Sequence, residues 1–242
     1  MQRVFDLWNR SWNRYREIGP LYALQRIWSR LVPRWLLGAE DALIFRLDLS
    51  PLQDREKDFE EVRWATEQDS EALAAFGSNP EELYDRLQRH ARAGIIERQG
   101  RVVAWNWCES GGHDQYDWLR FILGEEDIWS FDGWVAPEFR GKGLFPKVKG
   151  FMAAEYAQAG YTRMFSWIDT LNHNQQRANA EIGGRPVGRI MAVRILGLSV
   201  VRLGTSTRIG FWNVRKRLQI DVDHLCFNAG DSRQARKGSA LN

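Results

Sequence analysis

Residues 135–147 read VAPEFRGKGLFPK and place a lysine between two glycines, with an arginine before them and a proline after them. Gly141 and Gly143 allow the backbone to turn tightly and to come close to a partner. Pro146 suits the first turn of a helix, because its missing N–H removes no hydrogen bond there. The stretch therefore predicts a turn that opens a helix, and the unpaired N–H groups at such a helix start form a site for an anion.

The residues on either side of this turn support the prediction. Residues 128–135 (IWSFDGWV) are typical of a strand. In residues 147–160 the apolar side chains recur at helical spacing, at Val148, Phe151, Met152, Tyr156 and Ala159. Lys147 and Lys149 lie in the first turns of this helix, where the helix dipole disfavours cations, so a bound phosphate would explain them. We therefore expect a strand, a Gly-rich turn and a helix, in this order.

The rest of the chain predicts short strands and helices in mixed order. We expect strands at 59–66, 118–123, 161–169 and 185–196, one or two more between 200 and 212, and a hairpin over 94–110 that turns at Gln99-Gly100. We expect helices at 69–76, 80–94 and 172–183, with Asp69 and Asn79 as the N-caps of the first two. Residues 111–117 are expected to form a loop. This order predicts an α+β fold and not a doubly wound parallel sheet.

Residues 1–50 are set apart as a basic arm that is rich in Trp and Arg, and residues 1–37 contain no Lys. Two apolar stripes, separated by Gly19-Pro20, predict two amphipathic helices. The stripes consist of Phe5, Trp8, Trp12 and Tyr15, and of Leu21, Leu24, Trp28, Leu31 and Trp35. Three roles stay open for residues 1–37: packing on the main domain, an anchor at a membrane surface, and binding to an acidic carrier protein. No motif indicates sequence-specific binding of nucleic acid.

Composition limits the class of protein. A hydrophobic content of 44% and twelve Trp residues indicate a globular chain, and the net charge is +3. Cys108 and Cys226 lie far apart, and neither they nor the four His residues have metal-ligand spacing. We therefore expect no metal site, and reduced thiols in a cytoplasmic protein. The polar residues 228–242 are expected to be a disordered tail.

No stretch of the sequence predicts a membrane-spanning helix. The most apolar later stretch, residues 190–204, is interrupted by Arg194 and Arg202 and is too short to cross a bilayer. The N-terminus lacks the uninterrupted apolar core of a signal peptide. We expect a protein that is soluble, or peripheral at the inner face of the membrane.

From about residue 59 to residue 210, the sequence resembles the GCN5-related N-acetyltransferase (GNAT) superfamily. The acyl-CoA signature of that family is Arg or Gln, two residues, Gly, one residue, and then Gly or Ala. Arg140, Gly143 and Phe145 occupy these positions, after the frequent lead-in Val135-Ala136-Pro137. The resemblance implies a mixed, mostly antiparallel central sheet flanked by helices, preceded by the N-terminal helical arm.

A second family pattern, Asn…Gly-Phe, is matched in part. Asn172 stands where the helix after the next strand begins, and Gly183 stands where it ends. The resemblance implies an acyltransferase domain over residues 51–227. Arg-Pro-Val-Gly-Arg at 185–189 and the basic arm resemble members associated with bacterial surface polysaccharides, so an amino sugar is one expected acceptor.

The resemblance implies acetyl-CoA or another acyl-CoA as co-substrate. Backbone N–H groups from Arg140 to Phe145 are expected to bind its pyrophosphate. The pantetheine arm is expected to lie along the strand Trp129–Ala136, which a bulge at Gly133 would open. A backbone N–H near Trp134 or Val135 would polarise the thioester carbonyl. The expected cofactor-binding residues are Trp134, Val135, Ala136, Arg140, Gly141, Lys142, Gly143, Leu144, Phe145 and Asn172.

Three positions depart from the family pattern. Phe145 stands where Gly or Ala is usual, and Gly184 replaces the usual aromatic residue. Asn179 stands where the family often has a Tyr that protonates the leaving thiolate. Since an amide is a poor acid, this role must pass to another group or to water.

The expected catalytic residues are Asp132 and Asn179. An amine acceptor must lose a proton, and Asp132 is the carboxylate nearest to the expected thioester position. The other candidates for the base are Asp127, Glu126, Asp169, His113 and His173.

The sequence predicts an N-acyltransferase in which the amine attacks acyl-CoA directly within a ternary complex. Two alternatives stay open. The first is a non-catalytic protein that binds acyl-CoA or acts as a scaffold at a membrane surface. The second is an acyltransferase that takes the acyl group from an acyl carrier protein, whose acidic helices would bind a basic surface.

Overall fold

The computed structural model describes residues 37–52, 59–74, 86, 91–213 and 215–226. The helices predicted within residues 1–36 and the tail predicted at 228–242 lie outside these residues, as do most of the helix predicted at 80–94 and its N-cap Asn79. In the described ranges, no helix combines the length and the apolar character needed to cross a membrane.

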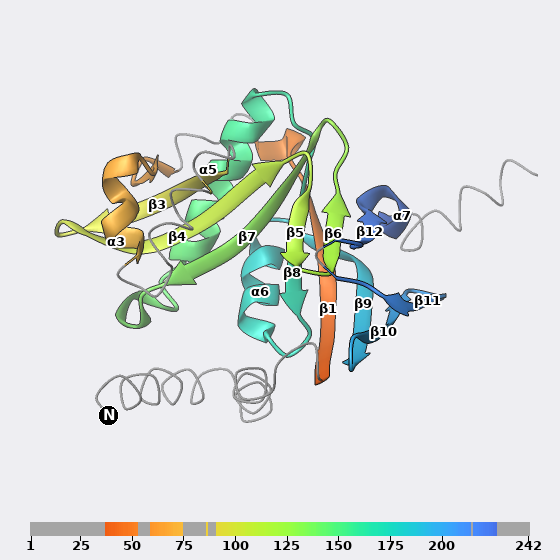
Figure 1. Ribbon diagram of the computed structural model, residues 1–242. Coiled ribbons are helices and arrows are strands. Elements are labelled where there is room, and N and C mark those ends of the chain that lie inside the picture. The colour runs from red at the N-terminus through yellow and green to blue at the C-terminus, as the bar shows by residue number, and fades with distance from the viewer. Residues whose placement is uncertain (1–36, 53–58, 75–85, 87–90, 214, 227–242) are drawn as a thin grey trace, which may run out of the picture.

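Nine strands form one mixed sheet in the order β11-β10-β9-β1-β8-β7-β4-β3-β2 (Figure 1). Their bounds are β1 (Leu37–Asp48), β2 (Val62–Trp64), β3 (Arg92–Arg98), β4 (Arg101–Ser110), β7 (Asp127–Val135), β8 (Arg163–Asp169), β9 (Arg185–Ile195), β10 (Leu198–Leu203) and β11 (Ser206–Phe211). Neighbouring strands are antiparallel, except that β7 and β8 run parallel. The predicted α+β fold with a mostly antiparallel sheet is confirmed, and so is the hairpin at Gln99-Gly100.

Helices pack on both faces of this sheet. Ile95 and Ile96 are consecutive in β3, so their side chains point to opposite faces. Ile96 is buried with α5 (Leu144–Gln158), whereas Ile95 is buried with Leu73 of α3 (Ser70–Ala74). The remaining helices of the described chain are α6 (His173–Glu181) and α7 (Val222–Cys226).

A second sheet has three strands in the order β12-β6-β5, with the bounds β5 (His113–Tyr116), β6 (Leu119–Ile122) and β12 (Leu218–Asp221). Its apolar side chains form one core with those of β9 and β10. The loop predicted at 111–117 is wrong, because β5 lies there. Its polar sequence hid the strand, which forms because His113 pairs with Phe121 and stacks its ring on Trp129 at 5.3 Å.

The helical arm predicted over residues 1–50 is wrong over its last part, because β1 is a central strand between β9 and β8. Both neighbours pair with β1, so its backbone groups are satisfied within the sheet. The register shifts between Ile44 and Phe45, and both of these consecutive side chains are buried. This irregularity breaks the alternation by which a strand is identified in a sequence.

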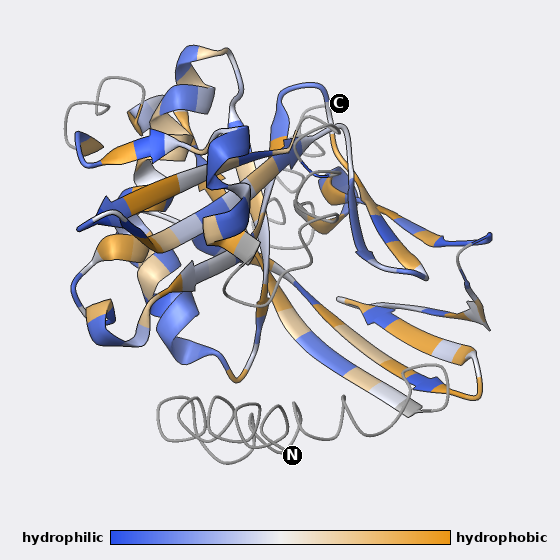
Figure 2. Ribbon diagram, turned by 60° about the vertical axis from the view of Figure 1, so that its left-hand side comes forward, coloured by the Kyte–Doolittle hydropathy of each residue, from blue (hydrophilic) through white to orange (hydrophobic). Residues whose placement is uncertain are grey.

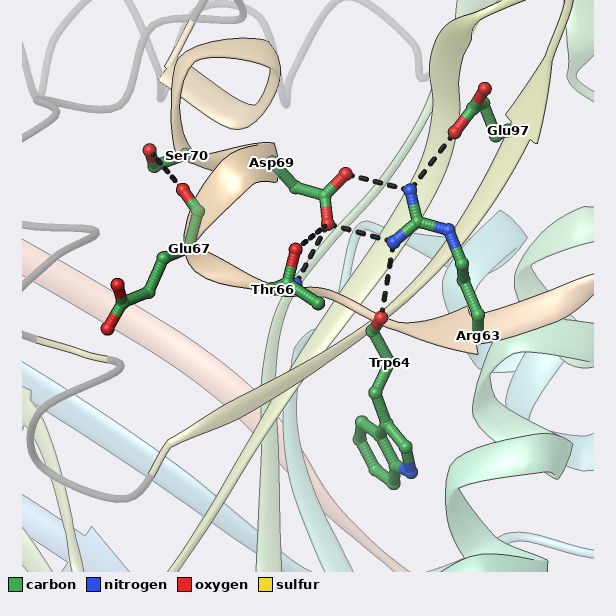
Figure 3. Close-up of polar contacts among 7 residues, drawn as sticks. All are labelled: Arg63, Trp64, Thr66, Glu67, Asp69, Ser70 and Glu97. Carbon is green, nitrogen blue, oxygen red and sulfur yellow. Dashed lines mark hydrogen bonds and ion pairs between the residues drawn. The ribbon is translucent and has the colours of Figure 1, made fainter.

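Thr66, and not the predicted Asp69, is the N-cap before α3, and it opens the 3-10 turn Glu67–Asp69 that leads into the helix (Figure 3). The Asp69 carboxylate accepts hydrogen bonds from the Thr66 backbone at 2.8 Å and from both terminal nitrogens of Arg63 at 2.8 Å. Arg63 also donates to Glu97 of β3 at 3.0 Å. The bonds from Arg63 lower the pKa of Asp69 to about 2.

Candidate active site

The Gly-rich turn has the predicted architecture. β7 ends at Val135, the 3-10 turn Pro137–Phe139 follows, and α5 begins at Leu144. Gly141 and Gly143 have φ angles of 73° and 72°, the left-handed region in which glycine is favoured. A Cβ added at either position would meet no atom within 4 Å, so the backbone of the turn is open to a ligand.

The open backbone amides of the turn begin at Gly141. The Arg140 N–H donates to the Pro137 carbonyl at 3.3 Å, and the Arg140 Nε donates to the Val135 carbonyl at 3.1 Å. Arg140 therefore fastens the turn to the end of β7, and its N–H is not available to a pyrophosphate as predicted. The first N–H groups of a helix lack intrahelical partners, and those of Leu144 and Phe145 lie in the first turn of α5.

A bulge lies on β7 at the predicted place. Trp134 pairs with Trp105 and Phe131 pairs with Trp107, so two residues, Asp132 and Gly133, stand opposite one residue of β4. Within this bulge, Asp132 has a positive φ angle, of 45°.

Gly133 explains how the chain accommodates Phe145 in place of the usual small residue. A Cβ on Gly133 would lie 2.3 Å from Cε2 of the Phe145 ring and 2.9 Å from Oδ1 of Asn106. The ring of the first helical turn therefore rests on the bulge, and the helix start and the strand fit each other as a pair.

The three predicted cofactor-binding residues at the end of β7 differ in what their amides face. Ala136 is buried and donates its N–H to the Val103 carbonyl of β4 at 2.8 Å, so this N–H is not available to a cofactor. Since N–H directions alternate along a strand, the Val135 N–H points away from β4, toward β8. Trp134 stacks on Trp105 with ring centroids 4.4 Å apart. Val135 is thus the one of the three whose amide faces the opening of the sheet.

This opening is a splay between the two parallel strands. The pairing of β7 with β8 ends at Ser130 and Ser166, although β7 continues to Val135 and β8 continues to Asp169. Figure 1 shows the two arrows separating as they run toward their carboxyl ends. An extended ligand chain that leaves the Gly-rich turn along β7 would run toward this last pair.

A buried polar cluster occupies the base of the splay. It consists of Asn106 and Cys108 of β4, Ser130 of β7, Lys149 of α5, Ser166 of β8 and Asn179 of α6. The Asn106 Nδ2 donates to the Ser130 Oγ at 2.9 Å, and the Cys108 thiol shares a hydrogen bond with the same Ser130. Burial raises the pKa of the Cys108 thiol to about 12.

Lys149 is the member of the cluster that sequence reasoning placed wrongly. Its side chain is 1% exposed, and its Nζ donates to the Ser166 Oγ at 3.1 Å and to the Asn179 Oδ1. It therefore does not face the Gly-rich turn, and it cannot compensate a phosphate there. Lys147, by contrast, is exposed and pairs with Glu61.

Burial disfavours the ammonium form of Lys149 and lowers its pKa to about 8. Within the described chain no carboxylate pairs with it, and its partners are a hydroxyl and an amide. The signal that could have found it is a lysine within a continuous run of buried residues, Val148 to Ala154. Because this helix is buried nearly all round, no polar face marks the position.

The two asparagines of α6 have different roles. Asn172 is the N-cap, as predicted, and its Oδ1 accepts from the Gln175 N–H at 3.2 Å. The amide of Asn179 donates to the Gln175 carbonyl at 2.8 Å, and its oxygen accepts from Lys149. The predicted catalytic position 179 is therefore joined to a titratable group from another helix.

Asp132 lies at the bulge, is exposed, and forms an ion pair with Arg86 at 2.5 Å. Asp127, another candidate for the base, is buried and bound by Arg163 at 2.6 and 2.9 Å, so it stabilises the fold instead. His113 is also buried, with its Nδ1 2.5 Å from Glu109.

The other candidates for the base lie apart from the cluster. Asp169 accepts from the Leu171 N–H at 2.8 Å, which closes the turn after β8. Glu126 and His173 are exposed, and their side chains are not part of the cluster described above. Among the residues that the structure describes, no group of three His, Cys, Asp or Glu side chains could hold a metal ion.

We compared this architecture with those of known proteins. No model of a known protein family and no curated protein matches the sequence. A GNAT acetyltransferase from Novosphingobium aromaticivorans is 16% identical, with a TM-score of 0.50 over 64% of this chain and 63% of that chain. A GNAT acetyltransferase from Colwellia psychrerythraea is 20% identical (TM-score 0.49; 66% and 57% covered). A Drosophila protein is 15% identical (TM-score 0.49; 71% and 57% covered). This chain has the fold of the GNAT acetyltransferases.

Proposed function

We propose that this protein is an N-acyltransferase that transfers an acyl group, with acetyl the first candidate, from acyl-CoA to an amine. The observation that carries the proposal is the continuity of one strand, β7, from an open Gly-rich turn to a splay with a polar cluster at its base. The amides of Gly141 to Phe145 bind the pyrophosphate at the positive end of α5. The pantetheine arm follows β7, and the Val135 N–H polarises the thioester carbonyl.

The reaction is direct attack within a ternary complex. The amine nitrogen bonds to the carbonyl carbon, the C–S bond breaks, and the electron pair leaves on sulfur. Asp132 takes the proton that the amine loses, and Arg86 keeps its carboxylate at the bulge beside the opening. Lys149 supplies the proton that the leaving thiolate needs, and regains it from solvent.

Lys149 and Asn179 together take the role that Tyr has in the related family. A cation without a carboxylate partner in a buried site stabilises a neighbouring anion strongly, because little solvent screens the charge. Asn179 and Ser166 orient the Lys149 Nζ from two sides. The leaving sulfur is the anion that the reaction produces at this end of the cofactor.

The acceptor that we propose to test first is an amino sugar, and we propose that the reaction takes place in the cytoplasm, at the inner face of the membrane. A free and buried Cys108 is compatible with a reducing compartment. The test is a continuous assay of CoA thiol release from acetyl-CoA with a panel of amines that includes glucosamine phosphates and small alkylamines. Transfer to at least one amine is expected. Binding of acetyl-CoA without turnover on any amine would support a scaffold instead, and turnover only with acyl carrier protein would overturn CoA as the donor.

A further inference from the structure

Strands β9, β10 and β11 expose an apolar face that the candidate active site does not use. In the described chain, the exposed large apolar side chains all belong to these strands and to the turn between β9 and β10: Met191, Val193, Ile195, Leu196, Leu198, Val200, Ile209 and Phe211. They form rows across the sheet, since Leu198 pairs with both Ile195 and Phe211. Figure 2 shows hydrophobic and hydrophilic residues alternating along these strands. We call these eight residues the β9–β11 face.

Only one side of these strands is covered. Ile190, Ala192 and Val201 point to the other side and are buried in the core shared with β12 and β6. The β9–β11 face is therefore a contiguous exposed apolar surface, and surfaces of this kind mark binding sites.

Leu196 at the tip of the hairpin has a conformation that folding alone does not favour. Its φ is 50° and its side chain is 65% exposed. A leucine at positive φ is strained, and Asn or Gly would fit this turn better. Strain at an exposed position indicates a function for the side chain. An apolar side chain at the furthest point of a hairpin suits entry into an apolar phase.

The chain segment that carries this face is basic. Residues 182–220 contain no Asp or Glu, and they contain eight basic residues: Arg185, Arg189, Arg194, Arg202, Arg208, Arg215, Lys216 and Arg217. Some of these pair with acids from elsewhere, as Arg189 does with Asp41. Arg202 pairs with Met191 on this face and donates to the Gly204 carbonyl, and Arg215 and Lys216 are exposed shortly after Phe211. The partner must therefore be apolar and anionic together.

We propose that the β9–β11 face binds the surface of an anionic lipid bilayer. Leu196, Leu198 and Phe211 enter the acyl boundary, and Arg202, Arg215 and Lys216 contact the headgroups. A second copy of this chain fits less well, because it would bring two acid-free basic segments together. β1, which carries residues 1–36 at its start, pairs Leu37 with Ile195, so the basic Trp-rich segment joins the protein at the same end of the sheet.

The test is flotation of the full chain with vesicles of phosphatidylcholine, with and without phosphatidylglycerol as the anionic lipid. Leu196→Asn removes the apolar tip and suits the positive φ, so it keeps the fold. Combined with Phe211→Ser, it is expected to weaken binding to anionic vesicles about tenfold or more. Arg215→Gln with Lys216→Gln is expected to weaken it about fivefold per charge.

The matched control is Arg98→Gln with Arg101→Gln, which removes one half-buried and one exposed charge from the hairpin near the opposite edge of the nine-stranded sheet. These two arginines pair with Glu61 and Glu138 and lie away from the β9–β11 face. It is expected to bind as the unaltered chain does. Equal binding by the Leu196→Asn, Phe211→Ser variant, with a native circular dichroism spectrum, would overturn the proposal. The proposal would also be overturned if the unaltered chain did not bind vesicles but formed a dimer in sedimentation that these substitutions dissociated.

Discussion

At the scale of single residues, Lys149 links the stability of the fold to the proposed chemistry. A lysine that is fully buried is destabilising in its charged form, and here its pKa falls from an ordinary value near 10.5 to about 8. Its hydrogen bonds to Ser166 and Asn179 hold it in place. A residue that lowers stability at neutral pH in this way is a candidate for function, because an apolar side chain would fit the same helix position better.

Lys149→Met tests this penalty through its dependence on pH. Between pH 8 and about pH 10.5 the unfolded chain keeps the proton that the folded chain has released, so the stability of the unaltered protein rises with pH in this window. We therefore expect the free energy of unfolding, measured in urea, to rise between pH 7.5 and pH 10.5 by about 3 kcal/mol more in the unaltered protein than in the variant. If the free energies of unfolding of the two proteins changed in parallel with pH, the lowered pKa of Lys149 would be contradicted.

The same substitution separates catalysis from binding. Lys149→Met should lower kcat by about a hundredfold, the usual range for loss of a proton donor, and leave the Kd for acetyl-CoA nearly unchanged. The kcat of the unaltered enzyme should fall as pH rises through about 8, because Lys149 loses its proton there. A variant with the same decline above this pH would show that another group donates the proton.

At the scale of elements, the start of α5 and the bulge of β7 fit together through one aromatic ring. Phe145 needs the missing Cβ of Gly133, and the turn before it depends on the Arg140 bond to Val135. The departure from the family pattern at position 145 is thus balanced by a glycine in the neighbouring strand. In a comparable way, Arg63 of β2 pairs with Asp69 in the turn before α3 and with Glu97 of β3.

Gly133→Ala should displace the Phe145 ring and lower the free energy of unfolding by about 1–3 kcal/mol, the range for overpacking. Adding Phe145→Ala should recover part of that loss, because it removes the nearer of the two clashes. The measurement is a double-mutant cycle in urea. Strictly additive effects would mean that the ring and the bulge do not constrain each other.

Asp69→Asn should lower the free energy of unfolding by about 2 kcal/mol at pH 7, since the folded pKa lies near 2 and the ordinary value near 3.8. The sign for a lowered carboxyl pKa is that this stability is present above pH 3.8 and is lost as pH falls through 2. Glu67→Gln, at an exposed neighbour, is the control and should have little effect. Denaturation curves between pH 2 and pH 7 measure both variants.

At the scale of the whole molecule, the local patterns of the sequence predicted the region around the Gly-rich turn and missed three strands. The strand, turn and helix around Gly143 follow from residue types that act locally, and so does the N-cap at Asn172. β1, β5 and β12 could not be found in this way. β1 contains an irregularity at Ile44, and β5 is polar and forms only because β6 pairs with it.

Some parts of the candidate site could be predicted from the sequence, and others could not. The open amides, the bulge near Gly133 and the cap were predictable, because glycine and asparagine reveal backbone needs. The polar cluster was not predictable, since its six members come from five different strands and helices and meet only in the folded chain. Lys149 and Asn179 are 30 residues apart in sequence, yet they share a hydrogen bond.

Calorimetric titration of acetyl-CoA tests the central claim most directly, with the unaltered chain, Gly143→Asn and Gly143→Asp. Both side chains tolerate positive φ, are alike in size and enter open space, so the two variants differ chiefly in charge beside the pyrophosphate. Saturable binding by the unaltered chain is expected, with Gly143→Asp at least about tenfold weaker than Gly143→Asn and the gap narrowing with added salt. Equal affinities of the two variants, or no binding by the unaltered chain, would contradict an acyl-CoA site at the Gly-rich turn.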